Sequence, residues 1–297
     1  MMASEFRSGF VAIIGPPNVG KSTLLNYLIG KKIAIVSPKP QTTRNRILGI
    51  YHGENFQIVF LDTPGIHKTR TPLHRSMVAS AQSTLQEVDI ILLMVEMKRP
   101  EPQEISQIIK KLKRVKKSVI LAINKIDLGP KEELLPISDS YRKRHDFDAI
   151  VPISALRGDG INSLLEELRS RLKQGPAFFP EGMETDQSES FLVSEIIREK
   201  IYIHTRKELP YSSAVTVERM QEAPEGDLLI ISAVLSVERQ SQKAILIGEK
   251  GRMIKKIGQA ARLEIERIFG THVFLELRVR VEKNWSRDTR ALRRLGY

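Results

Sequence analysis

A glycine-rich octapeptide, GPPNVGKS at residues 15–22, is the feature that most constrains how this chain can fold. It follows an apolar run at residues 10–14 and leads into residues 21–29, whose leucines recur at helical spacing. A strand, a tight loop of the form G-x-x-x-x-G-K-[ST] and a helix make up a phosphate-binding loop. The glycines let backbone N–H groups approach phosphate oxygens, and the positive end of the helix attracts the anion. The alternative is a glycine-rich turn that only starts a helix.

Strand-like and helix-like patterns alternate up to residue 172. Two apolar runs at residues 47–51 and 56–61, joined by HGEN, predict a hairpin. Repeated strands and helices imply a mostly parallel sheet with helices on both faces, which is an α/β domain. Besides 21–29, the expected helices are 73–85, 105–112 and 161–172, and the later strands are 90–95, 118–123 and 149–153.

The composition changes at residues 175–190, which are rich in Gly, Pro and polar residues and predict a linker. A chain of 297 residues suits two domains. We therefore expect one domain at 1–174, the linker at 175–190, and a smaller α+β domain at 191–297. In the second domain we expect helix 191–208, strands 213–221 and 228–238, helices 242–247 and 252–269, and strand 273–281.

Composition limits the classes of function. The chain has no cysteine, which excludes disulfides and thiolate metal sites and favours a reducing compartment. No apolar run approaches the roughly 18 residues that a membrane span needs, although attachment to a membrane surface stays open. The net charge is +12, and residues 239–297 carry a net +9, so we expect a polyanionic partner. The basic run KKLKRVKK at 110–117 reads as a solvated helix end.

Three polar motifs follow expected strands, where ligands bind to an open α/β sheet. DTPG at 62–65 places a carboxylate where Mg²⁺ would lie, and the Gly65 N–H could meet a γ-phosphate. In NKID at 124–127, the Asp127 carboxylate can accept both the ring N–H and the exocyclic amine of guanine. Adenine offers neither donor, so the motif predicts selectivity for GTP over ATP. Ser154 and Ala155 could close over the base.

The C-terminal domain contains GEKG at residues 248–251, between two apolar helical segments. This G-x-x-G turn and the order α-β-β-α-α-β resemble the type II KH fold, whose loop clamps the backbone of about four nucleotides. Glu249 departs from a purely basic loop, and Ile245, Ile247 and Ile254 could floor a groove for bases. Trp285 could stack on a base or pack a terminal helix that carries several arginines. The expected RNA-binding residues are Ile247, Gly248, Glu249, Lys250, Gly251, Arg252, Lys255 and Lys256.

GPPNVGKS, the pair Thr42 and Thr43, DTPG, NKID and ISA, in this order, resemble the G1 to G5 motifs of translation-factor-class GTPases. With the KH-like domain, the chain is similar over essentially its whole length to the Era family of ribosome-assembly GTPases. The resemblance implies a switch loop at residues 31–46. It implies a GTP-binding set of Gly15, Pro16, Pro17, Asn18, Val19, Gly20, Lys21, Ser22, Thr23, Asp62, Thr63, Pro64, Gly65, Ile66, Asn124, Lys125, Ile126, Asp127, Ser154 and Ala155.

The resemblance also implies Mg²⁺ as a cofactor, with Ser22, Asp62 and either Thr42 or Thr43 as its ligands. Catalytic contributions would come from Lys21, Thr43, Gly65 and Asn18. Ile66 stands where Ras-like GTPases use a glutamine to orient water, so we expect slow intrinsic hydrolysis. Our hypothesis is that Asn18 holds a K⁺ ion that accelerates hydrolysis, as in related GTPases; its alternative is that Asn18 only shapes the loop.

The function that the resemblance implies is a GTP-hydrolysing switch whose KH domain binds the 3′ end of 16S-type ribosomal RNA during assembly of the 30S subunit. We expect a cytoplasmic monomer that binds GTP and GDP, with loose peripheral attachment to the inner face of the cell membrane. One alternative is an RNA-binding module with a structural, non-hydrolysing nucleotide site. Another is a different assembly or tRNA-modification GTPase of the same superfamily, although the latter resemble chains with a functional cysteine, which is absent here.

Overall fold

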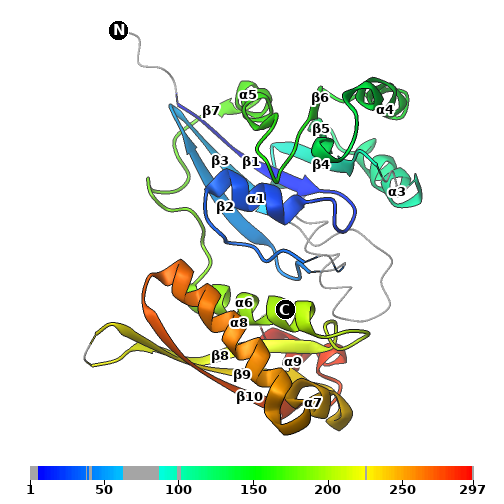
Figure 1. Cartoon of the computed structure of the whole chain (residues 1–297). Helices are drawn as coiled ribbons and strands as arrows, with labels where there is room; N and C mark the ends of the chain where they lie inside the picture. Colours follow the sequence, from blue (N-terminus) through cyan, green and yellow to red (C-terminus); the bar gives the residue numbers. More distant parts are fainter. Residues whose placement is uncertain are drawn as a thin grey trace. The chain divides into compact units, whose positions relative to one another are not determined.

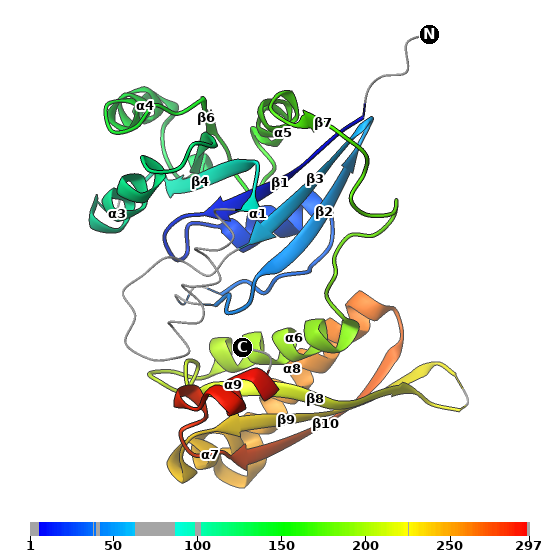
Figure 2. The same cartoon turned by 180° about the vertical axis from the view of Figure 1, so that it is seen from behind.

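The computed structural model describes residues 6–37, 39, 42–62, 87–98, 102–224 and 226–295. The described residues divide into two compact units (Figures 1 and 2). The first comprises 6–34, 43–62, 87–98 and 102–186; the second comprises 35–37, 39, 42, 187–224 and 226–295. The expected helix 73–85 and the expected site residues Thr63, Pro64, Gly65 and Ile66 lie outside the described residues.

The first unit is built on a sheet in the order β2-β3-β1-β4-β5-β6. Strand β2 runs antiparallel to β3, as expected for the hairpin, and the other neighbours in this order are parallel. The prediction of a mostly parallel sheet is therefore confirmed. The strands are β1 (Arg7–Ile14), β2 (Ile47–Gly53), β3 (Phe56–Asp62), β4 (Ile90–Glu96), β5 (Ser118–Asn124), β6 (Ala149–Pro152) and the short β7 (Lys173–Gln174), which pairs antiparallel with β1.

Helices cover both faces of this sheet (Figure 1). The apolar sides of α3 (Pro102–Leu112) and α4 (Leu134–Arg142) pack with Leu48, Ile50 and other strand residues in one buried cluster. Gly49 lies between those two residues and points to the opposite face, where a Cβ would come within 2.7 Å of Leu25 in α1 (Lys21–Ile29). Side chains alternate across a strand, so α1 lies on the face opposite to α3. Helix α5 (Ile161–Ser170) packs against β6.

Helix α4 is absent from the sequence-based expectations, because Pro136 interrupts its pattern. Proline breaks a helix when its missing N–H and its ring disturb an established turn, but it is tolerated in the first turn, where the N–H has no helical partner. Pro136 is the third residue of α4 and falls in that turn. Leu134, Ile137 and Tyr141 then place an apolar stripe against the core.

The second unit has a three-stranded sheet in the order β10-β9-β8, with β10 parallel and β8 antiparallel to β9. Helices α6, α7 and α8 pack on one face of it, and α9 lies on the other (Figure 2). The expected α+β order is confirmed. Its elements are α6 (Glu189–His204), β8 (Ser213–Glu222), β9 (Leu228–Val237), α7 (Gln240–Ile247), α8 (Arg252–Phe269), β10 (His272–Val281) and α9 (Thr289–Arg294). In the described part of the chain, no helix combines the length and apolarity of a bilayer span.

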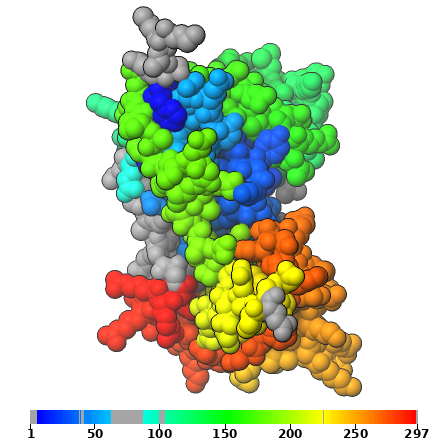
Figure 3. Space-filling model, turned by 90° about the vertical axis from the view of Figure 1, so that its left-hand side faces the viewer, coloured from blue at the N-terminus to red at the C-terminus, as the bar shows by residue number. Residues whose placement is uncertain are grey.

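Residues 175–186, expected as part of a linker, run along the surface of the first unit (light green in Figure 3). Phe178 N–H donates to Gln57 Oε1 at 2.8 Å, and the Phe178 ring lies 4.8 Å from that of Phe10. Further along, Ile50 N–H donates to the Glu184 carbonyl at 2.8 Å. Strand β2 is an edge strand, so this contact satisfies a backbone donor that would otherwise invite pairing with another chain.

The sole tryptophan, Trp285, is fully buried, and its Nε1–H donates to the Ser212 carbonyl at 3.1 Å. This supports packing rather than base stacking. We expect Trp285→Ala to lower the free energy of unfolding by about 3–5 kcal/mol, because it leaves a cavity. Trp285→Phe should cost about 1–2 kcal/mol through the lost hydrogen bond. Urea unfolding followed by circular dichroism measures both; an unchanged unfolding midpoint with weakened RNA binding would instead identify a stacking platform.

Candidate functional site

The predicted phosphate-binding loop connects β1 to α1, and its conformation depends on glycine at two positions. Gly15 has φ 152° and Gly20 has φ 103°, a region that side chains rarely adopt. A Cβ on Gly15 would lie 2.4 Å from the Met94 carbonyl oxygen, and one on Gly20 would lie 2.3 Å from Asn124 Nδ2. The loop therefore packs its backbone directly against the ends of β4 and β5. Asn18 also has a positive φ, of 61°.

Lys21 is held inside this loop. Its Nζ donates to the carbonyl oxygens of Gly15 at 3.1 Å and Pro16 at 2.9 Å. Burial lowers the pKa of Lys21 from its ordinary value, while the charges of Asp62 and Glu104 act in the opposite direction. The first turn of α1 contains no acidic residue, so the positive end of the helix is available to an anion. The loop thus wraps around the Lys21 side chain next to the N-terminus of α1.

Three side-chain oxygens meet beside the loop, at the end of β3. Ser22 Oγ donates to Asp62 Oδ2 at 2.7 Å and lies 3.0 Å from Thr43 Oγ1. Thr43 Oγ1 lies 3.4 Å from the same carboxylate oxygen. Oxygen ligands of this kind suit Mg²⁺. Among the described residues, no three His, Asp or Glu side chains cluster as a ready metal site, so a metal here would need these hydroxyls and phosphate oxygens.

The structure separates the two threonines that the sequence left as alternatives. Thr43 is buried and joins Ser22 and Asp62. Thr42 instead donates from its hydroxyl to the Lys39 carbonyl at 2.8 Å, and its own carbonyl accepts from Arg198 Nη2 at 2.6 Å. The site geometry therefore brings together Thr43, and not Thr42, with the other oxygens.

Asn124, at the end of β5, forms hydrogen bonds with the loop that follows β1 and with the loop that follows β6. Its Nδ2 donates to the Val19 carbonyl at 2.7 Å, and its Oδ1 accepts from Ala155 N–H at 2.9 Å. The side chain is buried. Because both of its polar atoms are engaged by backbone, Asn124 acts on a bound nucleotide by positioning the loops around it.

A cavity of about 190 Å³ lies where these loops meet. At its wall, Asp127 Oδ1 accepts from Ser154 Oγ at 2.7 Å, which orients the carboxylate. Leu128 and Leu156 also line the cavity although their exposed fractions are 50% and 75%. Sequence reasoning missed these leucines; the signal was an apolar residue directly after each of two polar motifs. The lining residues are Gly20, Thr23, Asn124, Lys125, Asp127, Leu128, Ala155 and Leu156.

Several of the predicted nucleotide-site residues lie close together. Gly20 and Asp127 line one cavity, and Ser22, two residues after Gly20, contacts Asp62. Lys125 lies at the cavity wall with a left-handed φ of 64° and pairs through Nζ with Glu96 Oε2 at 2.8 Å. Ile126 N–H donates to the Ile153 carbonyl at 3.3 Å.

In the second unit, the G-x-x-G turn lies between α7 and α8. Gly248 has φ 70°, and a Cβ on it would lie 2.8 Å from Met253 Cβ. Gly251 has φ 77° and open space around it, which permits close approach of another backbone. Lys250 also has a positive φ, of 50°. Glu249 pairs with Arg252, so the acid that departs from a basic loop is neutralised by its neighbour.

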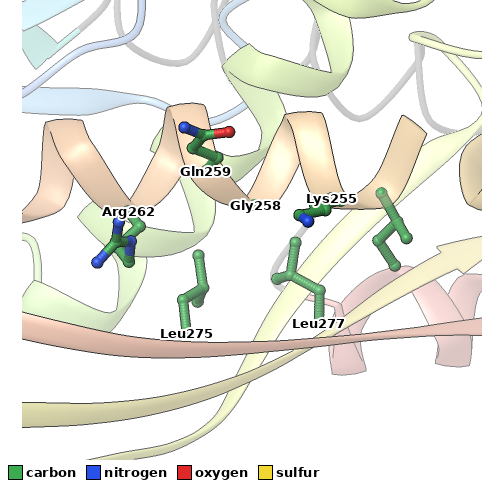
Figure 4. A pocket seen from close by; sticks show the side chains of 7 residues that line it. Lys255, Gly258, Gln259, Arg262, Leu275 and Leu277 are labelled. Atoms are coloured by element: carbon green, nitrogen blue, oxygen red, sulfur yellow. The ribbon is translucent and has the colours of Figure 1, made fainter. Parts of the chain in front are cut away.

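A groove of about 660 Å³ runs between α8 and β10 (Figure 4). Leu275 and Leu277 point from β10 toward α8, where Gly258 leaves room because it has no side chain. Of the three isoleucines expected to floor a groove, Ile254 lines this one, and Ile245 is instead 54% exposed. Sequence reasoning missed Gly258, although an isolated glycine inside a helical pattern is a signal of close approach. The lining residues are Ile254, Lys255, Gly258, Gln259, Arg262, Leu275 and Leu277.

Comparisons with known proteins find a family match in each of the two units. A family model described as a 50S ribosome-binding GTPase matches residues 10–125, and a KH domain model matches residues 208–286. The chain is 54% identical to GTPase Era of Syntrophus aciditrophicus over 98% of its own length and 95% of the relative's. It is 52% identical to GTPase Era of Geobacter metallireducens over the full length of both.

Two solved structures superpose with a TM-score of 0.93 at 43% identity, covering 98% of this chain and 99% of theirs. One is a variant of Aquifex aeolicus Era bound to GDP·AlF4⁻, and the other is Era in complex with MgGDPNP and nucleotides 1506–1542 of 16S ribosomal RNA.

The phosphate-binding loop, the oriented Asp127 carboxylate and the G-x-x-G groove define a P-loop GTPase that carries a KH domain. Identity of 52–54% over at least 98% of the chain assigns it to one family within that class. The chain belongs to the GTPase Era family.

The contact between Gly20 and Asn124 can be tested with matched substitutions. We expect Gly20→Ala to displace the Asn124 amide, weaken GTP binding by at least about tenfold, or ~1.4 kcal/mol, and lower the melting temperature. Gly30→Ala is the control, because Gly30 also has a positive φ, of 75°, but nothing lies within 4 Å of its Cβ position. Titration with a fluorescent GTP analogue measures the effect. Equal loss in both variants would mean that backbone strain alone is responsible.

Proposed function

We propose that this protein is a GTP-hydrolysing switch that binds the 3′ end of 16S-type ribosomal RNA through its KH domain and acts in assembly of the 30S subunit. The observation that carries the proposal is the full-length likeness to an Era structure in complex with MgGDPNP and a 16S rRNA segment. The G-x-x-G groove supports it independently, since its chemistry suits single-stranded RNA.

In this proposal the loop at residues 15–23 holds the nucleotide phosphates, and Lys21 contacts their outer oxygens. Ser22, Thr43 and Asp62 hold Mg²⁺, whose charge offsets that of the phosphates. Asp127 accepts from the two guanine donors, with Ser154 fixing its orientation, and Leu128 and Leu156 flank the base. An adenine base would leave the buried carboxylate without its donors, which selects GTP. The MgGDPNP complex of an Era relative supports the metal.

An RNA-binding module with an inert nucleotide site is the alternative. GDP·AlF4⁻ mimics a phosphoryl group in transfer, and its complex with an Era of 43% identity favours turnover. Hydrolysis in this chain involves residues 63–66 as well, which lie outside the described residues. We place the activity in the cytoplasm, with the protein as a monomer, and peripheral attachment to a membrane remains a prediction from the resemblance.

For the RNA ligand, the groove offers two kinds of contact. Leu275 and Leu277 form an apolar wall for bases, while Lys255 and Arg262 supply positive charge at its rim. The open space at Gly251 lets the nucleic-acid backbone approach the turn. Backbone contacts of this kind position the strand, and contacts with base edges read its sequence.

A side chain at Gly258 should block this groove. Gly258 lies in the interior of α8, and a Cβ there would be 3.4 Å from Leu277 Cδ1, so alanine fits and a larger side chain must enter the groove. We expect Gly258→Leu to weaken binding of an oligonucleotide matching the 16S rRNA 3′ end by at least about tenfold, on the order of the loss of one stacked base. Fluorescence anisotropy with the full chain measures it.

Gly258→Ala is the matched control and should bind RNA like the parent, with slightly higher helix stability. RNA-stimulated GTP hydrolysis should fall in Gly258→Leu and persist in Gly258→Ala. If Gly258→Leu binds the oligonucleotide as well as the parent, the RNA lies elsewhere. If the parent shows no RNA-stimulated hydrolysis, the switch function is wrong.

A K⁺ requirement is the finer part of the proposal. Asn18 in the phosphate-binding loop, together with Ile66 in place of a glutamine, motivates it. We expect faster GTP turnover in KCl than in NaCl at equal ionic strength. Asn18→Gly should remove the difference without straining the loop, because glycine adopts the positive φ of 61° found there. Equal rates for the parent in the two salts would dismiss the role of K⁺.

A further inference from the structure

A dense cluster of cations lies on the first unit, apart from both sites described above. Helix α3 ends at Leu112 within the run KKLKRVKK, and α4 ends at Arg142. The two helices are neighbours, because Arg144 Nη2 donates to Ser106 Oγ at 2.6 Å. Burial, and after it the charge of Lys113, lowers the pKa of His145, while the charges of Asp146 and Asp148 act in the opposite direction. We call this cluster the amino-edge patch; it consists of Lys110, Lys113, Arg114, Lys116, Lys117 and Lys143, all exposed.

The patch lies at the edge of the sheet opposite to the nucleotide site. The chain enters β5 at Ser118 directly after Lys117, and β5 ends at Asn124, which lines the nucleotide cavity. The loop after α4 reaches the same edge, where Asp148 Oδ2 accepts from Val119 N–H at 2.7 Å. Nucleotide binding therefore does not account for these cations.

Among the described residues, the two acids that act on His145 at this edge, Asp146 and Asp148, are fewer than the six cations of the patch. In the part of the chain that the structure describes, no ion pair involves any of the six patch residues. The nearby Asp139 forms an ion pair with Arg142, which is not one of the six, with 3.5 Å between Oδ1 and Nη1. The negative ends of α3 and α4 are equivalent to roughly −0.5 charge each, which can offset about one of six cations. The patch therefore keeps a net positive charge that an external polyanion can neutralise.

The kinds of side chain in and around the patch favour binding to the phosphates of a nucleic-acid duplex. The apolar side of α3 packs in the core through Ile105, Ile108 and Leu112, so α3 presents no fully exposed apolar side chain, among its described residues, to a bilayer. Tyr141 is buried, and the half-buried rings of His145 and Phe147 pack against each other, so the described aromatic side chains nearby offer little surface for stacking on single-stranded bases. Double-stranded RNA is recognised mainly through its backbone and shape, for which lysines on two neighbouring helix ends suffice.

We propose that the amino-edge patch is a second RNA-binding surface, on the GTPase unit, which holds the phosphate backbone of double-stranded RNA. It would act in addition to the single-strand groove of the KH domain, and two contacts on one RNA raise the overall affinity through effective concentration. The proposal does not depend on the assignment of the groove.

The test uses the full chain and a blunt RNA duplex of roughly 16 base pairs, which offers no single strand to the KH groove. We expect the triple variant Lys113→Gln, Arg114→Gln, Lys117→Gln to bind the duplex about tenfold more weakly near 0.1 M KCl. The slope of log affinity against log salt should become shallower by about 2–3. The control Lys131→Gln, Arg169→Gln, Lys173→Gln removes the same charge from exposed positions elsewhere on this unit and should bind like the parent.

Two further measurements separate this proposal from others. Binding of a single-stranded oligonucleotide and GTP binding without RNA should be unchanged in the patch variant, which also shows that it is folded. Duplex affinity equal to that of the parent overturns the proposal. Vesicles of phosphatidylcholine and phosphatidylserine form the last arm: if the patch variant loses vesicle binding and keeps duplex binding, the surface is a lipid contact and the proposal is wrong.

Discussion

The side-chain amide of Asn124 is the interaction on which the nucleotide site depends. It donates to the phosphate-binding loop at Val19 and accepts from the base loop at Ala155, so one residue at the end of β5 fixes the spacing between two loops. Neither bond could form unless β1, β5 and β6 ended at the same edge, which the parallel pairing of the sheet ensures. Removing the amide would leave buried backbone groups unpaired, at a cost of about 1–3 kcal/mol each.

The general fold could be predicted because its signals are local. Alternating apolar runs and helical spacing gave the mostly parallel sheet and the α-β-β-α-α-β order, both confirmed. Helix α4 was missed because Pro136 lowers the helix propensity of this segment. The helix forms nevertheless, because Tyr141 and its apolar neighbours pack against the core. The short β7 was also missed, since two residues carry no period and pair with β1 only through tertiary placement.

The candidate site was predictable to the extent that motifs carry chemistry at fixed spacing. On either side of Lys21, Ser22 contacts Asp62 and Gly20 lines one cavity with Asp127. The sequence could not choose between Thr42 and Thr43, because the choice depends on which hydroxyl faces Ser22 and which carbonyl faces Arg198. Likewise, Leu275 and Leu277 looked like ordinary strand residues, and only the absence of a side chain at Gly258 makes them the wall of a groove.

The polarity of the first sheet gives its two edges different electrostatics. At the carboxyl edge, an anion meets backbone N–H groups, a helix N-terminus and the buried Lys21, which solvent ions screen little. At the amino edge, the anion would meet exposed lysines, whose attraction falls off within about 10 Å at 0.1 M salt. Nucleotide affinity should therefore vary little with ionic strength while any polyanion at the amino edge is held strongly only in dilute salt. A rise in ionic strength would thus release a polyanion from the amino edge while the nucleotide stays bound.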